Sequence, residues 1–530
     1  MPDQGQLYFN GDIITVDSLN PGAEAVATKK GKIVAVGSKF FCASQLGGKP
    51  EEINLNGHTL LPGFIDTHLH PTLMILYEIY TDCSDLKSME ELKHRFKKIC
   101  RDKPETEWIL GLQFEEQYFD NPQFPCRHDL DEACPDHPVV LLKRDGHSLI
   151  ANTKAMKEAG ISSHTEEPDN GTIEREEDGH PSGVFREKAM DKIITSLPLP
   201  EIQTVLDAAS SIFKKITRFG ITSVSIILQT DSEGVMGEQG ALDVPLMEMV
   251  MDQIPISMYS MFAAKNVESI IKLKNSRLHQ EPGVGHSVGA LKLWMDGSFS
   301  SCTSKMEAPF SDYPDMSGML MDTPDAIYKR MVDGHKAGLQ LAVHSIGDKS
   351  TRICLELYDR LLTEFPKKDH RHRIEHASIM DQKSILEFAR LGIVASVQPM
   401  FIASEKNWLH KRLGRERAKW VYPFRSFLDA GVMVSGSSDA PIEILNVLHG
   451  IRSCVTRDGF EMHQAISVAE AIKMYTINAA FAQFEENFKG SITPGKRADM
   501  VILNTNPLKV PAREINAIVV EKTICNGNPI

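Results

Sequence analysis

Short apolar runs alternate with amphipathic, helix-like stretches along most of this chain of 530 residues. Apolar runs bounded by glycine, proline and polar residues are typical of buried strands, whereas apolar residues spaced three or four apart indicate helices. Helical spacing occupies, for example, residues 201–219 and 326–338. Strands of one sheet are predicted near residues 60–65, 221–227, 255–261, 288–294, 339–344, 371–376, 392–398 and 432–437. This alternation places the chain in the α/β class and fits a right-handed series of βα units closed into a parallel barrel.

The two ends of the chain show a different pattern, in which short strands follow one another without helices between them. Strands are predicted there at residues 7–16, 25–28, 30–37, 498–503, 517–520 and 522–527. All-β ends on both sides of an α/β middle suggest that the ends meet in one module. We therefore predict a β domain from residues 1–59 and 486–530, and a barrel domain from residues 60–485.

One connection within the barrel domain is far too long for a loop between a strand and the next helix. It covers residues 76–200 and contains its own apolar strand, Val139–Leu142, among turn-rich polar segments. We interpret it as a subdomain inserted after barrel strand 1, which lies over the mouth of the barrel and is a candidate lid.

Composition and charge narrow the class of protein. Hydrophobic residues at 42% and charged residues at 24% are ordinary for a globular enzyme. The net charge of -13, without a clustered basic face, argues against a nucleic-acid partner. No apolar run approaches the length of a membrane span, and no secretion signal is visible at the N-terminus. Nine cysteines without C-x-x-C spacing argue against a disulfide framework, so we expect a cytoplasmic protein.

Candidate chemistry begins at the predicted first strand, which leads into His68 and His70. Residues i and i+2 of a strand face the same way, so both imidazoles can bind one metal ion. His344, His376 and Asp439 follow later strands, and Lys292 lies inside another. A lysine within an apolar strand has to face solvent or a polar centre, because burying an unpaired ammonium is costly.

Each of these residues also has a purely structural interpretation. His-x-His occurs in ordinary half-buried strands, and a single histidine at a strand end is more often bonded to a backbone carbonyl. Asp439 is compatible with a helix N-cap because Pro441 follows it, and Lys292 with a charge on an edge strand. Four histidines, one lysine and one aspartate all lie at or near strand ends. This shared placement favours a metal centre over six unrelated structural roles.

Five motifs in this order resemble the amidohydrolase superfamily, within it the amidohydrolase-3 branch similar to N-substituted formamide deformylases. They are PGFIDTHLH at 62–70, LKLWMDGSFSS at 291–301, VHSIGD at 343–348, HRIEHASIM at 372–380 and GSSDAPIE at 436–443. The closing segment at 490–507 is also similar to this superfamily. The resemblance covers nearly the whole chain. It implies a TIM (β/α)8 barrel beside a small β-sandwich domain formed from both chain ends.

With this resemblance, the candidate ligands form a divalent metal centre. His68 and His70 with Asp439 would hold one ion, and His344 with His376 the second. The resemblance implies that Lys292 is carboxylated and bridges the pair, although one-metal sites also occur in this branch. Zinc suits imidazole and carboxylate ligands best, with iron or manganese nearly as suitable. The cofactor prediction is therefore one or two divalent ions, first of all Zn²⁺.

The expected chemistry is hydrolysis of C–N bonds in non-peptide amides, linear or N-substituted, including formamides. Metal-activated hydroxide would attack the carbonyl, with Asp439 as general base and then general acid, and Lys292 as the second catalytic residue. Asp66 and Glu375 adjoin ligands and are candidates for fixing the imidazole tautomers.

Substrate contacts are predicted at His147, Trp294, Asp296 and Trp408. His147 lies in the inserted subdomain. An equally weighted alternative is that it is a polar loop residue without a function. As partners we expect a small-molecule substrate, no nucleic acid and no membrane, with a homo-oligomer (dimer) left open.

Three other functions remain open on the same scaffold. A deaminase would usually carry a glutamate shortly after the fifth-strand histidine, but Ser345-Ile346-Gly347-Asp348 offers none. An isomerase or decarboxylase would use the same metal without net hydrolysis. A catalytically silent scaffold protein would be expected to lose ligands, whereas this chain has every one.

Overall fold

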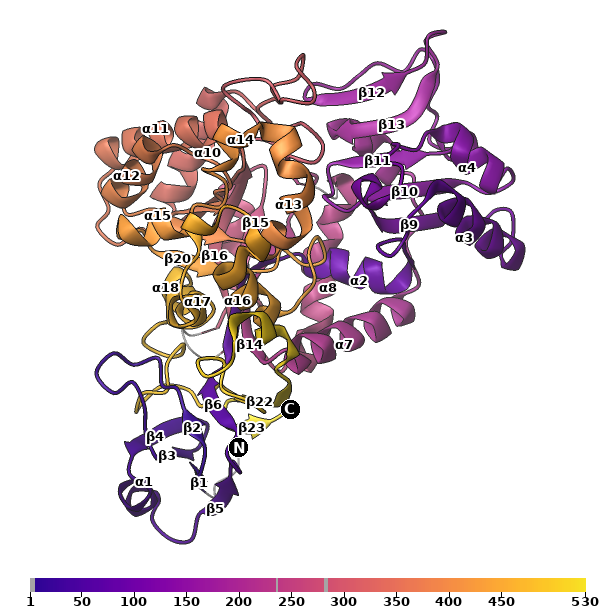
Figure 1. Ribbon diagram of the computed structural model, residues 1–530. Coiled ribbons are helices and arrows are strands. Elements are labelled where there is room, and N and C mark those ends of the chain that lie inside the picture. Colours follow the sequence, from indigo (N-terminus) through magenta and orange to yellow (C-terminus); the bar gives the residue numbers. More distant parts are fainter. Residues whose placement is uncertain (1–4, 235–236, 281–284) are drawn as a thin grey trace.

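The computed structural model of the protein describes residues 5–234, 237–280 and 285–530. Its centre is an eight-stranded parallel sheet whose strands follow chain order, which confirms the α/β class and a nearly closed barrel (Figure 1). The strands are β7 (Phe64–Leu69), β14 (Ile221–Gln229), β15 (Ser257–Ala263), β16 (His286–Trp294), β17 (Gln340–Ser345), β18 (Arg373–His376), β19 (Val394–Val397) and β20 (Val434–Gly436). Seven of the eight predicted runs cover most or all of the corresponding strand.

Helices follow most of the barrel strands and pack against their outer faces in one large apolar cluster. Helix α10 shows why they form: the Thr323 side chain accepts a hydrogen bond from the Ala326 amide, Pro324 occupies the first turn, and Ile327 and Met331 are buried on one face. The helices are α2 (Pro71–Ile79), α7 (Ile202–Arg218), α8 (Asp243–Val250), α9 (Val267–Leu273), α10 (Pro324–Lys336), α11 (Asp348–Glu364), α12 (Gln382–Leu391), α13 (Met400–Leu413), α14 (Arg415–Ala418), α15 (Phe424–Asp429), α16 (Val447–Thr456), α17 (Val468–Met474) and α18 (Ile477–Ala482).

The first barrel strand begins later than the sequence predicted. Residues Thr59–Pro62 form β6, which pairs with β21 (Met500–Leu503) in a separate sheet, and the chain enters the barrel only at β7. The apolar run continues through both strands, so hydrophobicity alone cannot mark the change of sheet. Gly63 lies at the junction, where a Cβ would come within 2.3 Å of the Thr222 side chain. The close approach of β14 therefore requires glycine there.

The barrel closes through a short seam between its first and last strands. The Asp439 amide donates to the His68 carbonyl at 2.8 Å, and the His70 amide donates to the Ala440 carbonyl at 2.8 Å. Leu69 and Ala440 form an isolated parallel bridge rather than a ladder. The seam therefore joins the ends of β7 and β20 at the candidate ligands themselves.

Both chain ends contribute to two small sheets beside the barrel (Figure 1). One contains β1 (Gln6–Phe9), β3 (Ala25–Lys29), β4 (Lys32–Gly37) and β5 (Glu51–Asn54), and helix α1 (Lys39–Leu46) connects β4 to β5. The other contains β2 (Asp12–Ile13), β6, β21, β22 (Val520–Cys525) and β23 (Asn528–Pro529). Tyr8 and Val26 of the first sheet share an apolar cluster with Leu60 and Met500 of the second. This shared cluster supports the proposed sandwich, and the predicted domain boundaries stay predictions.

The long insertion has a six-stranded sheet and two apolar clusters of its own. Figure 1 shows it beside the barrel, above α2 and α7. Its elements are β8 (Thr81–Asp82), α3 (Met89–Asp102), β9 (Ile109–Phe114), α4 (Arg127–Ala133), β10 (Val139–Lys143), β11 (Ser148–Ala151), α5 (Thr153–Glu158), β12 (Gly171–Arg175), β13 (Pro181–Glu187) and α6 (Asp191–Ile194). Whether it moves as a lid stays a hypothesis.

One pair of cysteines is bonded, which the sequence did not predict. Cys100 and Cys134 form a disulfide, with their Cα atoms 6.1 Å apart, while the other seven cysteines are free. The packing of α3 against α4 brings the pair together, which a spacing of 34 residues does not reveal. A single bridge is not a framework. Among the described residues, no helix is both long and apolar enough to span a membrane.

Candidate metal centre

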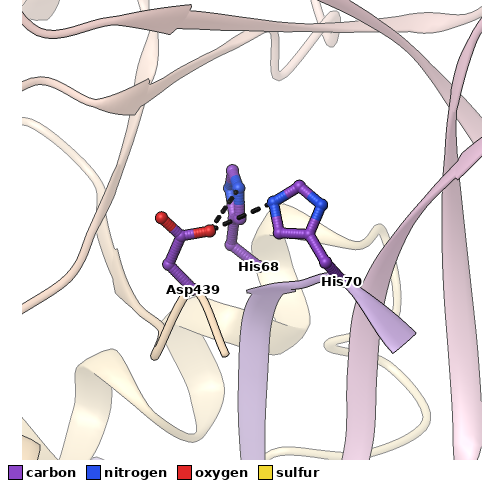
Figure 2. Close-up of side chains that lie close together, drawn as sticks. All are labelled: His68, His70 and Asp439. Atoms are coloured by element: carbon purple, nitrogen blue, oxygen red, sulfur yellow. Dashed lines mark ion pairs between the residues drawn. The ribbon is translucent and has the colours of Figure 1, made fainter. Parts of the chain in front are cut away.

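Three predicted ligands meet at the barrel seam. The Asp439 Oδ1 atom lies 3.3 Å from His68 Nε2 and 3.2 Å from His70 Nε2, and Figure 2 shows both imidazoles turned toward this carboxylate. One ligand atom from each residue lies within 4.8 Å of the others. The separation suits the coordination of a single ion, because ligand atoms about 2 Å from a metal lie about 3–4 Å from one another.

The local backbone explains how these ligands come together. His68 lies inside β7 and His70 directly follows its end, so strand alternation turns both side chains to the same face. Asp439 follows β20 with a φ of 61°, in the left-handed region. Aspartate tolerates this conformation better than most residues. Asn446, not Asp439, caps the next helix, α16, so the N-cap interpretation of Asp439 is wrong.

His344 and His376 complete the cluster from neighbouring strands. Their ring centroids lie 4.5 Å apart, and the His376 ring lies 5.0 Å from that of His68. His376 Nδ1 is 3.9 Å from Asp439 Oδ2. His344 Nε2 lies 3.1 Å from the Gly297 carbonyl oxygen, which leaves its other ring nitrogen for a ligand. All four histidines and the aspartate therefore lie around one centre.

Lys292 lies on β16 and is almost fully buried. Its Nζ atom has no hydrogen-bond partner and is 5.0 Å from the Trp294 ring centroid. Burial lowers the pKa of this ammonium to about 8, although Glu375 and Asp439 act in the opposite direction. An amine with a pKa of about 8 is partly unprotonated at neutral pH, and the unprotonated amine is the form that reacts with carbon dioxide. The edge-strand interpretation of Lys292 is wrong, because β16 lies between β15 and β17.

The donor set fits a divalent ion. His376 Nδ1 and Lys292 Nζ are both buried without a hydrogen bond, and each such atom costs about 1–3 kcal/mol unless something binds it. Burial lowers the pKa of His70 and, to about 3, that of His376, so both imidazoles are in the neutral form that binds metals. Burial would raise the pKa of Asp439, but His68 and its hydrogen bond hold it well below its usual range.

A buried carboxylate orients His68 from behind. Glu375 Oε2 lies 2.5 Å from His68 Nδ1, and Arg373 donates to both Glu375 oxygens at 2.6 and 2.9 Å. This contact directs His68 Nε2 toward the centre, as expected of Glu375. Asp66 acts differently: it accepts the backbone amides of His68 and Ser438 at 3.1 Å and so holds the seam rather than an imidazole.

The centre opens into a cavity of about 90 Å³ between the barrel and the insertion. Two predicted substrate contacts, His147 and Trp294, line it, whereas Asp296 and Trp408 do not. The buried Asp296 carboxylate instead accepts the amides of Ile346 and Gly347 and so fixes the turn after β17. Trp408 packs in the apolar cluster around the barrel. Their predicted substrate contacts therefore find no support in the geometry.

His147 reaches the cavity from the insertion and has a carboxylate partner. Its Nδ1 lies 2.9 Å from Glu187 Oε2, and its ring centroid is 5.8 Å from that of His344. Burial alone would lower the pKa of His147, but Glu187 raises it to about 9. His147 is therefore a cation at neutral pH, whose second ring nitrogen can donate to an oxygen in the cavity.

Polar contacts fix the insertion to the barrel rim beside His147. Arg144 donates to Glu443 Oε1 at 2.9 Å and to the Ile442 carbonyl at 3.1 Å, just beyond the last barrel strand. Asp145 Oδ2 accepts the Ser298 and Ser301 hydroxyls at 2.9 and 2.6 Å. The segment is therefore anchored on two sides of the mouth.

Comparison with known proteins agrees with this geometry. The family described as "Amidohydrolase family" matches residues 51–530 of the chain. The chain belongs to the amidohydrolase family. It is 29% identical to the putative amidohydrolase YtcJ of Bacillus subtilis, over 98% of both chains, and 27% identical to the N-substituted formamide deformylase of Arthrobacter pascens, over 98% of this chain and 97% of that one. It is 31% identical to the protein LONG AFTER FAR-RED 3 of Arabidopsis thaliana, over 97% and 89%.

Solved structures resemble this amidohydrolase over nearly its whole length. An uncharacterized metal-dependent hydrolase from Pyrococcus furiosus superimposes with a TM-score of 0.72 at 26% identity, covering 95% of this chain and 100% of that one. Atrazine chlorohydrolase TrzN from Arthrobacter aurescens, solved with zinc, has a TM-score of 0.55 at 14% identity, over 99% and 94%, which shows a shared fold only. The amidohydrolase is therefore a metal-dependent hydrolase.

Four polar residues of this amidohydrolase contact the cavity or its lining and were missed from the sequence. They are Asp145, Glu187, Glu405 and Tyr422. Glu405, on α13, accepts a hydrogen bond from the Tyr422 hydroxyl, and burial raises its pKa to about 8. Asp145 is two residues from His147 and could have been found by that proximity. Glu405 and Tyr422 lie on separate segments with no motif, so only the fold brings them to the cavity.

Proposed function

We propose that this amidohydrolase hydrolyses C–N bonds in non-peptide amides, with N-substituted amides and formamides as the substrate class. The observation that carries the proposal is the complete donor set: four histidines, Asp439 and the unpaired Lys292 face one buried centre. The likeness to the Arthrobacter deformylase supports the substrate class.

Each residue of the centre has a distinct role in this proposal. His68, His70 and Asp439 would hold one divalent ion, for which we propose zinc, and His344 with His376 the second, with a carboxylated Lys292 between them. Such an ion lowers the pKa of water toward neutrality and polarises a carbonyl. Glu375 keeps His68 in the tautomer whose Nε2 faces the centre.

The proton path of the proposed hydrolysis runs through Asp439. Water adds to the amide carbonyl carbon while Asp439, ionised in this site, takes one of its protons. The C–N bond then breaks, and the same carboxyl gives that proton to the leaving nitrogen. The products are a carboxylic acid and an amine, formate being the acid from a formamide. His147, as a cation, donates to the substrate oxygen and steadies its developing negative charge.

The deaminase alternative has weaker support. The segment after His344, at the end of β17, contains no glutamate. Its Ile346 and Gly347 amides instead donate hydrogen bonds to the Asp296 carboxylate. Among the described residues, no observation favours another function over amide hydrolysis.

A substrate screen tests the proposal. Metal-loaded protein is incubated with N-formyl, N-acyl and cyclic amides, and the released amine is measured; the control is Asp439→Asn, which removes the proton acceptor. We expect release from N-substituted amides by the parent only. Release by both proteins at equal rates, or by neither while the parent is folded and metal-loaded, would contradict the proposal.

A further inference from the structure

A second, larger cavity lies next to the catalytic one. Its volume is about 370 Å³, and it lies between the insertion sheet and helices α2, α7 and α8, which are neighbours in Figure 1. Its walls are formed almost entirely by hydrocarbon, from Leu110, Val140 and Leu149 of the insertion and from Ile75 and Leu246 of the helices. An apolar cavity of about 150 Å³ already binds benzene, so this one holds a larger apolar group.

Three side chains separate the two cavities. Leu73 of α2, Leu142 of β10 and Ile194 of α6 line both of them. The partition is therefore one layer of side chains thick. Leu142 is only half-buried, and a change of its rotamer would open a path between the two cavities. A molecule whose amide lies at the metal centre would then extend past this partition into the apolar space.

The outer rim of the second cavity exposes large apolar side chains. Ile202 is 66% exposed, Leu199 60%, Met249 50% and Leu242 42%. Clustered exposed hydrophobic residues mark binding surfaces more often than isolated ones do. The deepest wall residues, Val140 and Leu149, are almost fully buried, so a flat protein surface resting on the rim would not reach them. The depth of this cavity and its shared wall with the catalytic cavity favour part of the substrate as occupant.

Three residues with hydroxyl groups, Thr72, Tyr77 and Tyr80, also line this cavity. The Tyr77 hydroxyl is buried without a hydrogen-bond partner, and burial raises its pKa, so it keeps its proton. It can therefore pair with a polar atom of a bound molecule. An orphaned hydroxyl costs about 1–3 kcal/mol while it stays unpaired, which is a reason to expect that a ligand pairs with it.

We propose that this cavity, which we call the apolar subsite, binds the apolar substituent of the amide substrate, a medium-length alkyl or arylalkyl group. The inference rests on the proposed function, because it assumes that the amide lies at the metal centre. The metal ligands alone do not determine which amides are bound. With the apolar subsite, the enzyme discriminates among amide substrates by the size of the group attached to the amide.

A chain-length series tests the apolar subsite. Binding of N-methyl-, N-butyl-, N-hexyl-, N-octyl- and N-decyl-N-hydroxyformamide, hydroxamates with the chain on nitrogen, to the metal-loaded protein is measured by calorimetry. We expect affinity to rise about fourfold with each added methylene group until the subsite is filled. In Leu246→Trp, whose indole occupies the subsite, the long chains should lose this gain while N-methyl-N-hydroxyformamide binds as before. Leu386→Trp, the same change at an exposed leucine on α12, is the matched control.

Each outcome decides between the subsite and its alternatives. Affinity that does not depend on chain length, or that rises equally in Leu246→Trp, would overturn the subsite. A dimer that dissociates in Met249→Asp, with chain-length dependence unchanged, would instead assign the rim to a second copy of the chain. If no hydroxamate binds, the proposed function fails, and the subsite is decided by the neutral fluorophore N-phenyl-1-naphthylamine. Its binding should be lost in Leu246→Trp, and no binding to the parent would overturn the subsite as well.

Discussion

Asp439 combines three features that no other described residue shares. It contributes a carboxylate oxygen that faces two imidazoles, it has a left-handed backbone, and its amide closes the barrel seam. Asparagine at this position would have nearly the same shape as aspartate, but its amide group cannot take a proton from water.

We predict that Asp439→Asn lowers turnover by on the order of a hundredfold or more, because positioned acid–base catalysis is lost. Thermal stability should change little, since asparagine also tolerates the left-handed region. The matched control is Asp381→Asn, at a residue that does cap a helix, α12, and this variant should keep the parent rate. Equal rates in both variants would contradict the assignment of Asp439.

For Lys292→Ala we predict lower metal content, from about two ions per chain toward one, together with a lower rate. In the metal-free protein the Lys292 ammonium is buried without a partner, so its removal should leave the thermal stability of that form unchanged or raise it. Elemental analysis of the purified variant measures the first effect and thermal unfolding the second. Parent-level metal content in this variant would exclude a bridging role.

At the scale of single elements, the loop between β10 and β11 connects the insertion to catalysis. It carries His147 into the cavity, while Arg144 and Asp145 fasten it to the barrel on either side. A segment anchored in this way positions its histidine with little freedom. If the insertion opens as a lid, we expect the movement to occur farther from this loop.

The charge of His147 predicts a pH dependence. Burial would lower its pKa, but Glu187 raises it to about 9, so His147 is a cation below that pH and becomes neutral above it. We predict that kcat/KM falls as the pH rises through about 9, and that His147→Gln removes this fall. The same cation contributes stability that is fully present below the ordinary histidine pKa and is lost as the pH rises toward 9. His128→Gln, at an exposed histidine beside Glu176, serves as control, and an unchanged profile in His147→Gln would contradict the prediction.

Strand periodicity made much of the fold and centre predictable from the sequence. His68 and His70 share a face because they are two residues apart, and His344 and His376 come directly at strand ends, so their meeting followed from the barrel. The start of β7 was not predicted, because the apolar residues on both sides of Pro62-Gly63 indicate a single strand. Contacts between distant segments were also beyond reach. Glu187, Glu405 and the Cys100–Cys134 bridge depend on packing that no local pattern encodes.

At the scale of the whole molecule, the metal ligands connect the two ends of the barrel sequence. Asp66 and Ser438, which bond across the seam, are 372 residues apart. We predict that a chelator lowers the unfolding temperature, because an ion bound by His68, His70 and Asp439 stabilises the folded state by its binding free energy. Calorimetric scans with and without chelator measure this shift. An unchanged unfolding temperature after complete metal removal would contradict it.

The same seam imposes an order on biosynthesis. A ribosome releases the chain from its N-terminus, so β7 and its two histidines emerge long before β20 and Asp439 do. The nascent barrel has an open edge until the last strand arrives, and no complete ligand set exists before that moment. Metal loading must therefore be one of the final events of maturation, and truncated products of translation would be unable to retain the ion at this site.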